Sequence, residues 1–233
     1  MKKAFREFRV LLRSVPPVLV TLMVLSVVGM NLLANKSINT GLSWLALDCG
    51  ILLSWLIFLT MDVLTHCYGP RAATLLSFAA LALNLFMALV FFIASRIPGV
   101  WGESFVEGSG DIINTALDNT FGGAWYVILG SSVAFAVSAV INNFLNYGIG
   151  RLLKKELTFG RFALRSYVST FIAQFADNLT FALIVSRLFF GWTLTQCFTC
   201  ALTGAVFELL FEVFFSPIGY RISKKLIAER EKA

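Results

Sequence analysis

Charged side chains are scarce in this chain of 233 residues, where they fill 14% of the positions, and there is a single histidine. Hydrophobic residues make up 58%, including 23 phenylalanines. A water-soluble domain of this length needs far more polar surface to cover its core. The composition therefore excludes a sizeable soluble domain and predicts one membrane domain over residues 1–233.

Metal-binding and redox motifs are also missing. The four cysteines lie within or beside apolar runs and suit a packing role, at Cys49, Cys67, Cys197 and Cys200. The last two form a C-x-x-C pair, but no second cysteine or histidine pair lies near it. Neither a Walker motif nor a Ser-His-Asp arrangement is evident. We expect no enzyme activity, no cofactor, no metal and, because the basic residues border apolar runs, no nucleic-acid partner.

Long apolar runs are present instead. A helix needs about 20 mostly apolar residues to cross the hydrocarbon core, and six segments reach that length. They lie near residues 14–34, 41–64, 72–94, 124–147, 167–189 and 193–217. The sequence therefore predicts an all-α integral membrane protein, a bundle of six transmembrane helices. Residues 96–123 form an acidic outer loop, whose middle at 111–117 is either a solvated connector, which we favour, or a short surface helix.

Basic residues indicate the orientation of these helices, since Lys and Arg gather in cytoplasmic loops. With a cytoplasmic N-terminus, all of the 19 basic residues except Lys36, Arg96 and Arg187 fall on the cytoplasmic side. Arg165 is among them, because the spacing places it in the loop before the fifth helix. Both termini are therefore expected in the cytoplasm, N-in and C-in.

Acidic residues inside the apolar segments are the first candidates for function. A charge at the bilayer centre costs on the order of 3 kcal/mol on insertion scales, so it usually faces a cavity or a partner. The segments contain Asp48, Asp62, Asp177, Glu208 and Glu212, with no Lys or Arg away from the helix ends. The interior is therefore expected to be acidic or partly protonated.

One polar stripe stands out on the fifth helix. Gln174, Asp177, Asn178 and Phe181 follow the i, i+3, i+4, i+7 spacing of a single helix face, and Asp177 lies near the middle of its segment. The stripe offers two amides, a carboxylate and an aromatic ring together. We interpret it as a binding surface, with a purely structural network as the alternative.

Two further acidic sites lie on other helices. Glu208 and Glu212 are four positions apart on the last helix, where like charges repel unless one is protonated or each has a partner. Glu212 is alternatively solvated at the inner interface. A Gly-Pro pair ends the second helix, so Asp62 and His66 occupy its last turns and Arg71 follows at the inner interface, where it can pair with Asp62.

Four motifs follow one another along nearly the whole chain, namely N-L-L-A-N-K at 31–36, M-D-V-L-T-H-C-Y-G-P-R at 61–71, R-S-Y-V-S-T-F-I-A-Q-F-A-D-N-L-T-F at 165–181 and F-F-S-P-I-G-Y at 214–220. Together they resemble the queuosine precursor transporters, also called vitamin-uptake-transporter-like proteins. In that family a Glu usually stands where this chain has His66, and a Gln and an Asp are common at the positions of Ala139 and Asn142.

The resemblance implies a multi-pass homodimer in the bacterial inner membrane that imports a 7-deazaguanine precursor of the tRNA nucleoside queuosine. A guanine-like edge offers adjacent N–H donors to a carboxylate, its carbonyl suits an Asn or Gln donor, and its flat face stacks on aromatic rings. We therefore expect a substrate-binding set of Asn31, Asp62, Arg71, Gln174, Asp177, Asn178, Phe181 and Glu208.

Two classes of function remain open for such a protein. The first is a secondary carrier, in which Glu208 or Asp62 couples proton entry to transport. The second is a substrate-binding membrane subunit that depends on a separate ATP-driven module to import a vitamin or nucleobase. An intramembrane enzyme has the least support, because one interfacial histidine is too little for a metal site.

Overall fold

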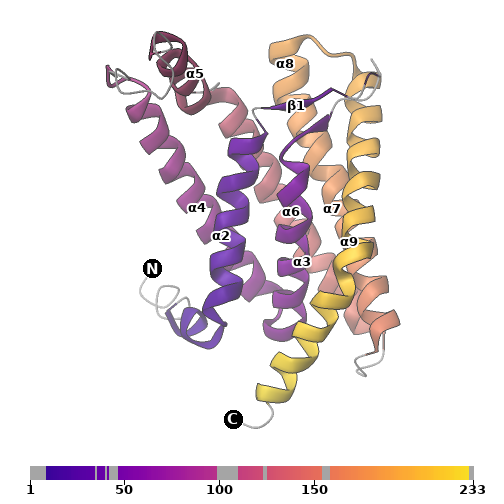
Figure 1. Cartoon of the computed structure of the whole chain (residues 1–233). Helices are drawn as coiled ribbons and strands as arrows, with labels where there is room; N and C mark the ends of the chain where they lie inside the picture. The colour runs from indigo at the N-terminus through magenta and orange to yellow at the C-terminus, as the bar shows by residue number, and fades with distance from the viewer. Residues whose placement is uncertain are drawn as a thin grey trace.

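The chain is helical almost throughout in the computed structural model, which describes residues 9–34, 36–39, 41, 47–98, 110–122, 125–153 and 158–230. Residues 9–14 are helical and lead into the first long element. The elements follow in the order α2 (Pro17–Leu33), β1 (Ser37–Ile38), β2 (Leu47–Asp48), α3 (Ile51–Tyr68), α4 (Pro70–Ala94), α5 (Gly110–Gly122), α6 (Trp125–Leu152), α7 (Phe159–Phe181), the π-helical η1 (Ala182–Ser186), α8 (Arg187–Phe190) and α9 (Leu194–Arg230). Figure 1 shows the long helices running side by side.

Five of the described helical stretches are long and apolar enough to cross a membrane. They contain α3, α4, α6, α7 and α9. The apolar α2 has 17 residues and reaches roughly 26 Å at ~1.5 Å per residue, a little less than the ~30 Å hydrocarbon core. Large apolar side chains also point away from the bundle, with Phe86 59% and Phe214 75% exposed. These features together are those of a multi-pass membrane protein.

The predicted start of the second transmembrane segment, residue 41, is wrong. Leu47 and Asp48 form β2 and pair antiparallel with β1, so α3 begins only at Ile51. Apolar composition alone does not separate a short strand from the first turns of a helix. The expected end is closer to the structure, since α3 stops at Tyr68 and Gly69 follows with φ 87°, a left-handed conformation that glycine adopts without strain. Pro70 then begins α4.

The helices that contain the fifth and sixth predicted segments extend beyond the predicted bounds. The observed α7 begins at Phe159 rather than 167, and α9 continues through Pro217 to Arg230 rather than ending at 217. A run of about 20 apolar residues estimates the part of a helix that crosses the bilayer. The helix itself can be longer, because charged and polar residues on either side of that run can also be helical. Proline removes one backbone hydrogen bond, and α9 accommodates that loss within its length.

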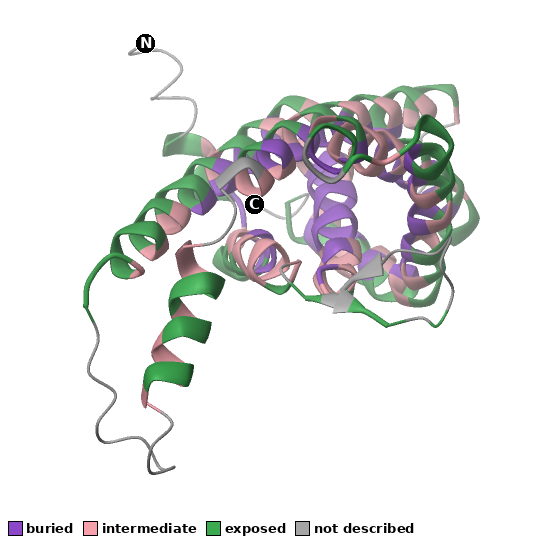
Figure 2. Ribbon diagram, turned by 90° about the horizontal axis from the view of Figure 1, so that it is seen from above, coloured by how far each residue is buried: buried purple, intermediate pink, exposed green. Residues whose placement is uncertain are grey.

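The loop predicted over residues 96–123 contains a helix, whereas the sequence favoured a solvated connector at 111–117. Residues Gly110–Gly122 form α5, which has no buried residue. Phe121 of α5 stacks on Phe91 of α4, with ring centroids 5.1 Å apart at 23°. This aromatic contact holds α5 against the end of α4, at the edge of the bundle in Figure 2.

The interior of the bundle lies among α3, α6, α7 and α9. The helix α7 packs against both α6 and α9, while α3 packs against α2, α4, α6 and α9. Buried positions gather on the sides of these helices that face one another (Figure 2). Many of the buried side chains there are polar, which is unusual for a bundle interior and locates the candidate site.

Candidate functional site

A continuous polar face runs along α7 toward the bundle interior. The stripe predicted at Gln174, Asp177 and Asn178 extends two turns back toward the start of the helix. We define the α7 polar face by the residues at i, i+3 and i+4 spacing that are buried or half-buried there: Arg165, Ser166, Ser169, Thr170, Gln174, Asp177 and Asn178. It meets polar side chains from α3, α6 and α9 in three successive groups.

The first group surrounds Arg165, which is 8% exposed. Its Nε donates to Oδ1 of Asn146 over 2.9 Å, Nη2 donates to the same oxygen, and Nη1 contacts Nδ1 of His66. Because a guanidinium can only donate, Nδ1 of His66 accepts and the imidazole carries its proton on Nε2. A buried cation therefore lies beside a neutral histidine.

Two predictions are therefore wrong: that Arg165 lies in a loop, and that the interior contains no Lys or Arg. Because α7 begins at Phe159, Arg165 lies almost two turns inside the helix and faces α3 and α6. The basic residue that sequence counting assigned to the cytoplasmic loop is a buried partner of polar side chains. Charge alone did not reveal this, because the helix start was placed too late.

The second group surrounds Asp62, which is fully buried. Its Oδ1 accepts a 2.7 Å hydrogen bond from Nδ2 of Asn142, and its Oδ2 contacts Ser166 Oγ and, at 3.4 Å, Thr170 Oγ1. The expected pairing with Arg71 is not found among the described residues, since Arg71 is exposed at the start of α4. Asp62 instead faces inward to α6 and α7, where neutral donors surround it.

Glu212 of α9 completes this second group. It is fully buried, and its Oε1 lies 2.6 Å from Ser166 Oγ, while Oε2 has no hydrogen-bond partner within the described part of the chain. The alternative of a solvated carboxylate at the inner interface is therefore wrong for Glu212. One turn further along α9, Ser216 Oγ lies 2.7 Å from the hydroxyl of Tyr167.

The third group holds four of the eight residues of the predicted substrate-binding set, namely Gln174, Asp177, Asn178 and Glu208. Oδ1 of Asp177 accepts a 2.6 Å hydrogen bond from Ser138, and Nδ2 of Asn178 donates over 3.2 Å to Oε2 of Glu208. Gln174 is 1% exposed, and its Nε2 has no partner in the described ranges. Amide and carboxylate groups from α7 and α9 thus face one another with α6 beside them.

Backbone features around this third group are consistent with close approach. A Cβ on Gly204 of α9 would lie 2.7 Å from Nδ2 of Asn178, so only glycine lets the amide sit there. Phe181, half-buried, ends α7, and the π-helical turn η1 follows directly. Single π-helical turns within α-helices are frequent at functional sites.

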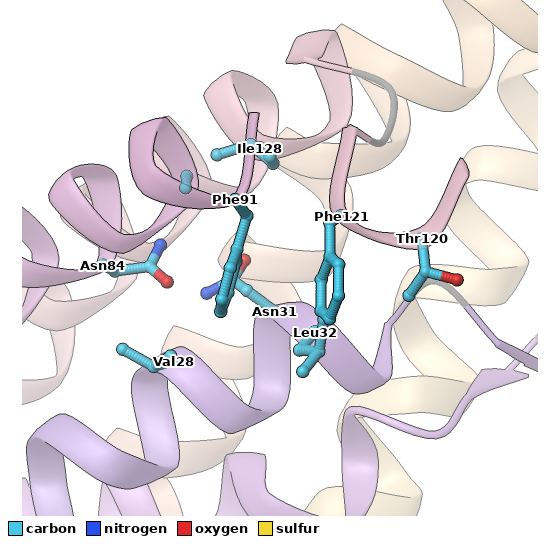
Figure 3. A pocket seen from close by; sticks show the side chains of 9 residues that line it. Val28, Asn31, Leu32, Asn84, Phe91, Thr120, Phe121 and Ile128 are labelled. Carbon is cyan, nitrogen blue, oxygen red and sulfur yellow. The ribbon is translucent and has the colours of Figure 1, made fainter. Parts of the chain in front are cut away.

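Asn31 lies elsewhere, in a pocket between α2, α4, α5 and α6 (Figure 3). The pocket holds about 370 Å³, its open side included, and Phe91 and Phe121 form one wall. The Asn31 Oδ1 accepts from Ser131 over 2.6 Å and its Nδ2 donates to the Val27 carbonyl over 2.8 Å. Of the eight predicted site residues, Asn31 therefore lies in a separate pocket and Arg71 is exposed, whereas Asp62, Gln174, Asp177, Asn178 and Glu208 belong to the polar interior. Phe181 is half-buried at the end of α7.

Sequence reasoning missed several partners of this interior. Ser138, Ser166 and Thr170 are small hydroxyl residues that look like ordinary packing residues in an apolar helix. A signal for two of them was present, because two steps of four positions back from Gln174 along the same face reach Thr170 and then Ser166. The Ser138 contact with Asp177 spans two helices and has no signal in the spacing of either.

The comparisons with known proteins add one finding. The family described as "Putative vitamin uptake transporter" matches residues 48–222, which include α3 to α8, most of α9 and the entire α7 polar face. No curated protein and no solved structure matches the chain.

Proposed function

The chain belongs to the vitamin uptake transporter family, and from that premise we propose that it imports a 7-deazaguanine precursor of queuosine as a secondary carrier. The proposal includes six membrane crossings, with α2 as the first, both termini in the cytoplasm of a bacterium, and a homodimer. It is a proposal for a transporter and not for an enzyme.

The observation that carries this proposal is the contact between Asn178 and Glu208 beside Gln174. A guanine-like base presents two neighbouring N–H donors and a carbonyl acceptor. A carboxylate such as Glu208 or Asp177 accepts the donors, and the amide of Gln174 or Asn178 donates to the carbonyl. The third polar group therefore has the complementary chemistry on helices that face each other.

The side-chain amide of Gln174 gives an energetic reason for binding such a base. A buried amide donor without a partner costs about 1–3 kcal/mol, and Gln174 Nε2 is such a donor among the described residues. A base carbonyl that accepts from Nε2 would recover that energy on binding. A purely structural role leaves the unpaired donor unexplained.

The acidic side chains also suit one member of the precursor class. An aminomethyl-7-deazaguanine carries a positive charge at neutral pH, and the third polar group contains the carboxylates of Asp177 on α7 and Glu208 on α9. A hydrogen bond in which the donor or the acceptor is ionised is stronger than a neutral one, and here both partners are expected to carry charge. We therefore expect the cationic precursor to bind more tightly than the uncharged ones.

Uptake by the purified protein in liposomes tests the proposal and its alternative together. Labelled aminomethyl-7-deazaguanine should enter vesicles that contain only this chain, and excess unlabelled precursor should block entry, whereas excess adenine should not. Binding without uptake would favour a substrate-binding subunit that needs an ATP-driven module. If the folded protein shows no binding and no uptake of the precursor, the proposed substrate is wrong.

A further inference from the structure

One hydroxyl group lies between two buried carboxyl groups in the second polar group of the site. Ser166 Oγ of α7 contacts Oδ2 of Asp62 on α3 and, at 2.6 Å, Oε1 of Glu212 on α9. Both carboxyl side chains are 0% exposed, so water does not separate or screen them. Three helices therefore meet at a single serine oxygen.

The number of hydrogens at this oxygen decides the protonation of the group. A serine hydroxyl has one hydrogen and can donate it to only one acceptor. Two ionised carboxylates cannot both be satisfied by one hydrogen, and their negative charges repel at this separation. Ser166 therefore donates to one of the two carboxyl groups. Its contact with the other is a hydrogen bond only if that other carboxyl group is protonated and donates to Ser166 Oγ.

The surrounding donors identify which carboxyl group is protonated. Asp62 receives hydrogen bonds from Asn142 and Thr170 in addition to its contact with Ser166, so it has the donors that an ionised carboxylate requires. Within the part of the chain that the structure describes, the one hydrogen-bond contact of Glu212 is with Ser166, and its buried Oε2 has no donor there. The hydrogen-bond direction therefore runs from Glu212 through Ser166 to Asp62.

The charges that face this group are consistent with one proton. Arg165 of α7 lies at the next position from Ser166 as a buried cation, and His66 of α3 is the neutral acceptor beside it. From α9, Glu208 lies one turn from Glu212 and contacts Asn178, while α6 contributes the uncharged Asn142. With Glu212 protonated, the interior around Ser166 contains one anion, Asp62, and one cation, Arg165.

We propose that Glu212, Ser166 and Asp62 form the proton-binding site of the carrier, with Glu212 as the group that holds the transported proton. The role in coupling rests on the proposed function. The site shares α7 and α9 with the substrate-binding contact Asn178–Glu208, so a shift of α9 against α7 changes both sites at once. One proton binds Glu212 from the outer side as one substrate binds, and the same proton leaves to cytoplasmic water after the substrate is released.

Infrared spectroscopy of the purified protein tests the proton without any substrate. A protonated carboxyl group gives a carbonyl stretching band that shifts in D₂O, and this band should be present near neutral pH. The variant Glu212→Gln should lose this band, because the amide keeps the volume and can donate to Ser166 without carrying a titratable proton. Glu229→Gln, at an exposed surface ion pair with Lys225, is the matched control and should keep it.

The possible outcomes of that measurement are distinct. A band that persists in Glu212→Gln and disappears in Asp62→Asn would assign the proton to Asp62 and overturn the assignment to Glu212. A folded parent protein with no band of a protonated carboxyl group would overturn the site entirely. Neither result depends on which substrate is transported, so the proton site and the proposed substrate fail separately.

Uptake into liposomes then tests coupling, with labelled aminomethyl-7-deazaguanine as the probe. An inward gradient of one pH unit should raise accumulation about tenfold, since each tenfold concentration ratio corresponds to about 1.4 kcal/mol. Glu212→Gln should bind the probe as the parent does and exchange it, but should not accumulate it. Accumulation that follows a sodium gradient, or that Glu212→Gln retains in full, would overturn proton coupling at this site.

Discussion

The side-chain amide of Asn178 donates a 3.2 Å hydrogen bond to Glu208 and so joins α7 to α9 within the bundle interior. The position of this amide depends on Gly204, because a Cβ there would lie 2.7 Å from Nδ2 of Asn178. The contact brings one amide and one carboxylate to the face where Gln174 and Asp177 also lie. Changes to these four side chains should therefore affect ligand binding more than folding.

Replacing Asp177 with Asn should weaken binding of the precursor. The substitution keeps the volume and an oxygen that can accept from Ser138, but it removes the charge that accepts donors from the base. A hydrogen bond to a charged group contributes about 1.5–3 kcal/mol, so affinity should fall roughly 10- to 150-fold. Equilibrium binding to the purified variant is the measurement. Ser138→Ala is the control, since it removes one hydrogen-bond donor to Asp177 but leaves the carboxylate. If Asp177→Asn binds the precursor as tightly as the parent does, Asp177 is not part of the site.

Replacing Gln174 with Met should separate stability from binding. Met has a similar volume and no polar atoms that need a donor or acceptor, so it removes the unpaired buried amide. We expect a gain in unfolding free energy of about 1 kcal/mol together with a loss of affinity of about fivefold or more. Thermal unfolding and ligand binding on the same preparation provide both values. A less stable variant that binds normally would show that Gln174 is a structural residue.

Replacing His66 with Glu should place a carboxylate against the buried guanidinium of Arg165. The new ion pair has a bidentate donor available, so folding should survive, and we expect a change in transport rate or in preference among precursors. The neutral His66→Gln serves as the control for volume. If His66→Glu transports every precursor as the parent does, the residue has no selective role.

A reporter fused after Ala233 should be active only on the cytoplasmic side. This follows from the excess of Lys and Arg at one end of the helices, together with six crossings that include α2. In Figure 1 the start of α2 and the end of α9 lie toward the same side of the bundle. A reporter active only in the periplasm would indicate five crossings and leave α2 outside the count.

The sequence predicted the helices and one side of the site, for identifiable physical reasons. Long apolar runs are local properties of the sequence, so they predicted the spans around α4 and α6. The 3.6-residue period is local as well, so it predicted that the polar residues from Gln174 to Asn178 share one face of α7. The end of α3 after Tyr68 could also be predicted, because Gly69 adopts a left-handed conformation that ends the helix and Pro70 lacks the N–H that would continue it. The start of α7 and the end of α9 were missed, since both lie in sequence that contains charged residues and apolar composition does not indicate where such a helix begins or ends.

The contacts between helices could not be predicted in the same way. The partners of Asp62 come from α6 and α7, 80 and 104 positions away in the chain, and nothing local to Asp62 specifies them. The sequence suggested an ion pair between Asp62 and Arg71 because the two residues are close in the chain. The structure does not place them together, since Asp62 faces inward while Arg71 is exposed. The pocket at Asn31 likewise depends on how α5 folds back onto α4, which composition does not specify.

The queuosine content of tRNA in living cells tests the central claim most directly. The host should be a bacterium that cannot synthesise queuosine precursors and lacks its own transporter, supplied with a low concentration of aminomethyl-7-deazaguanine. Expression of this chain should restore queuosine in tRNA, while Asp177→Asn at the same membrane level should restore much less. Queuosine no higher than with an empty vector, although the protein is folded in the membrane, would contradict the proposed import.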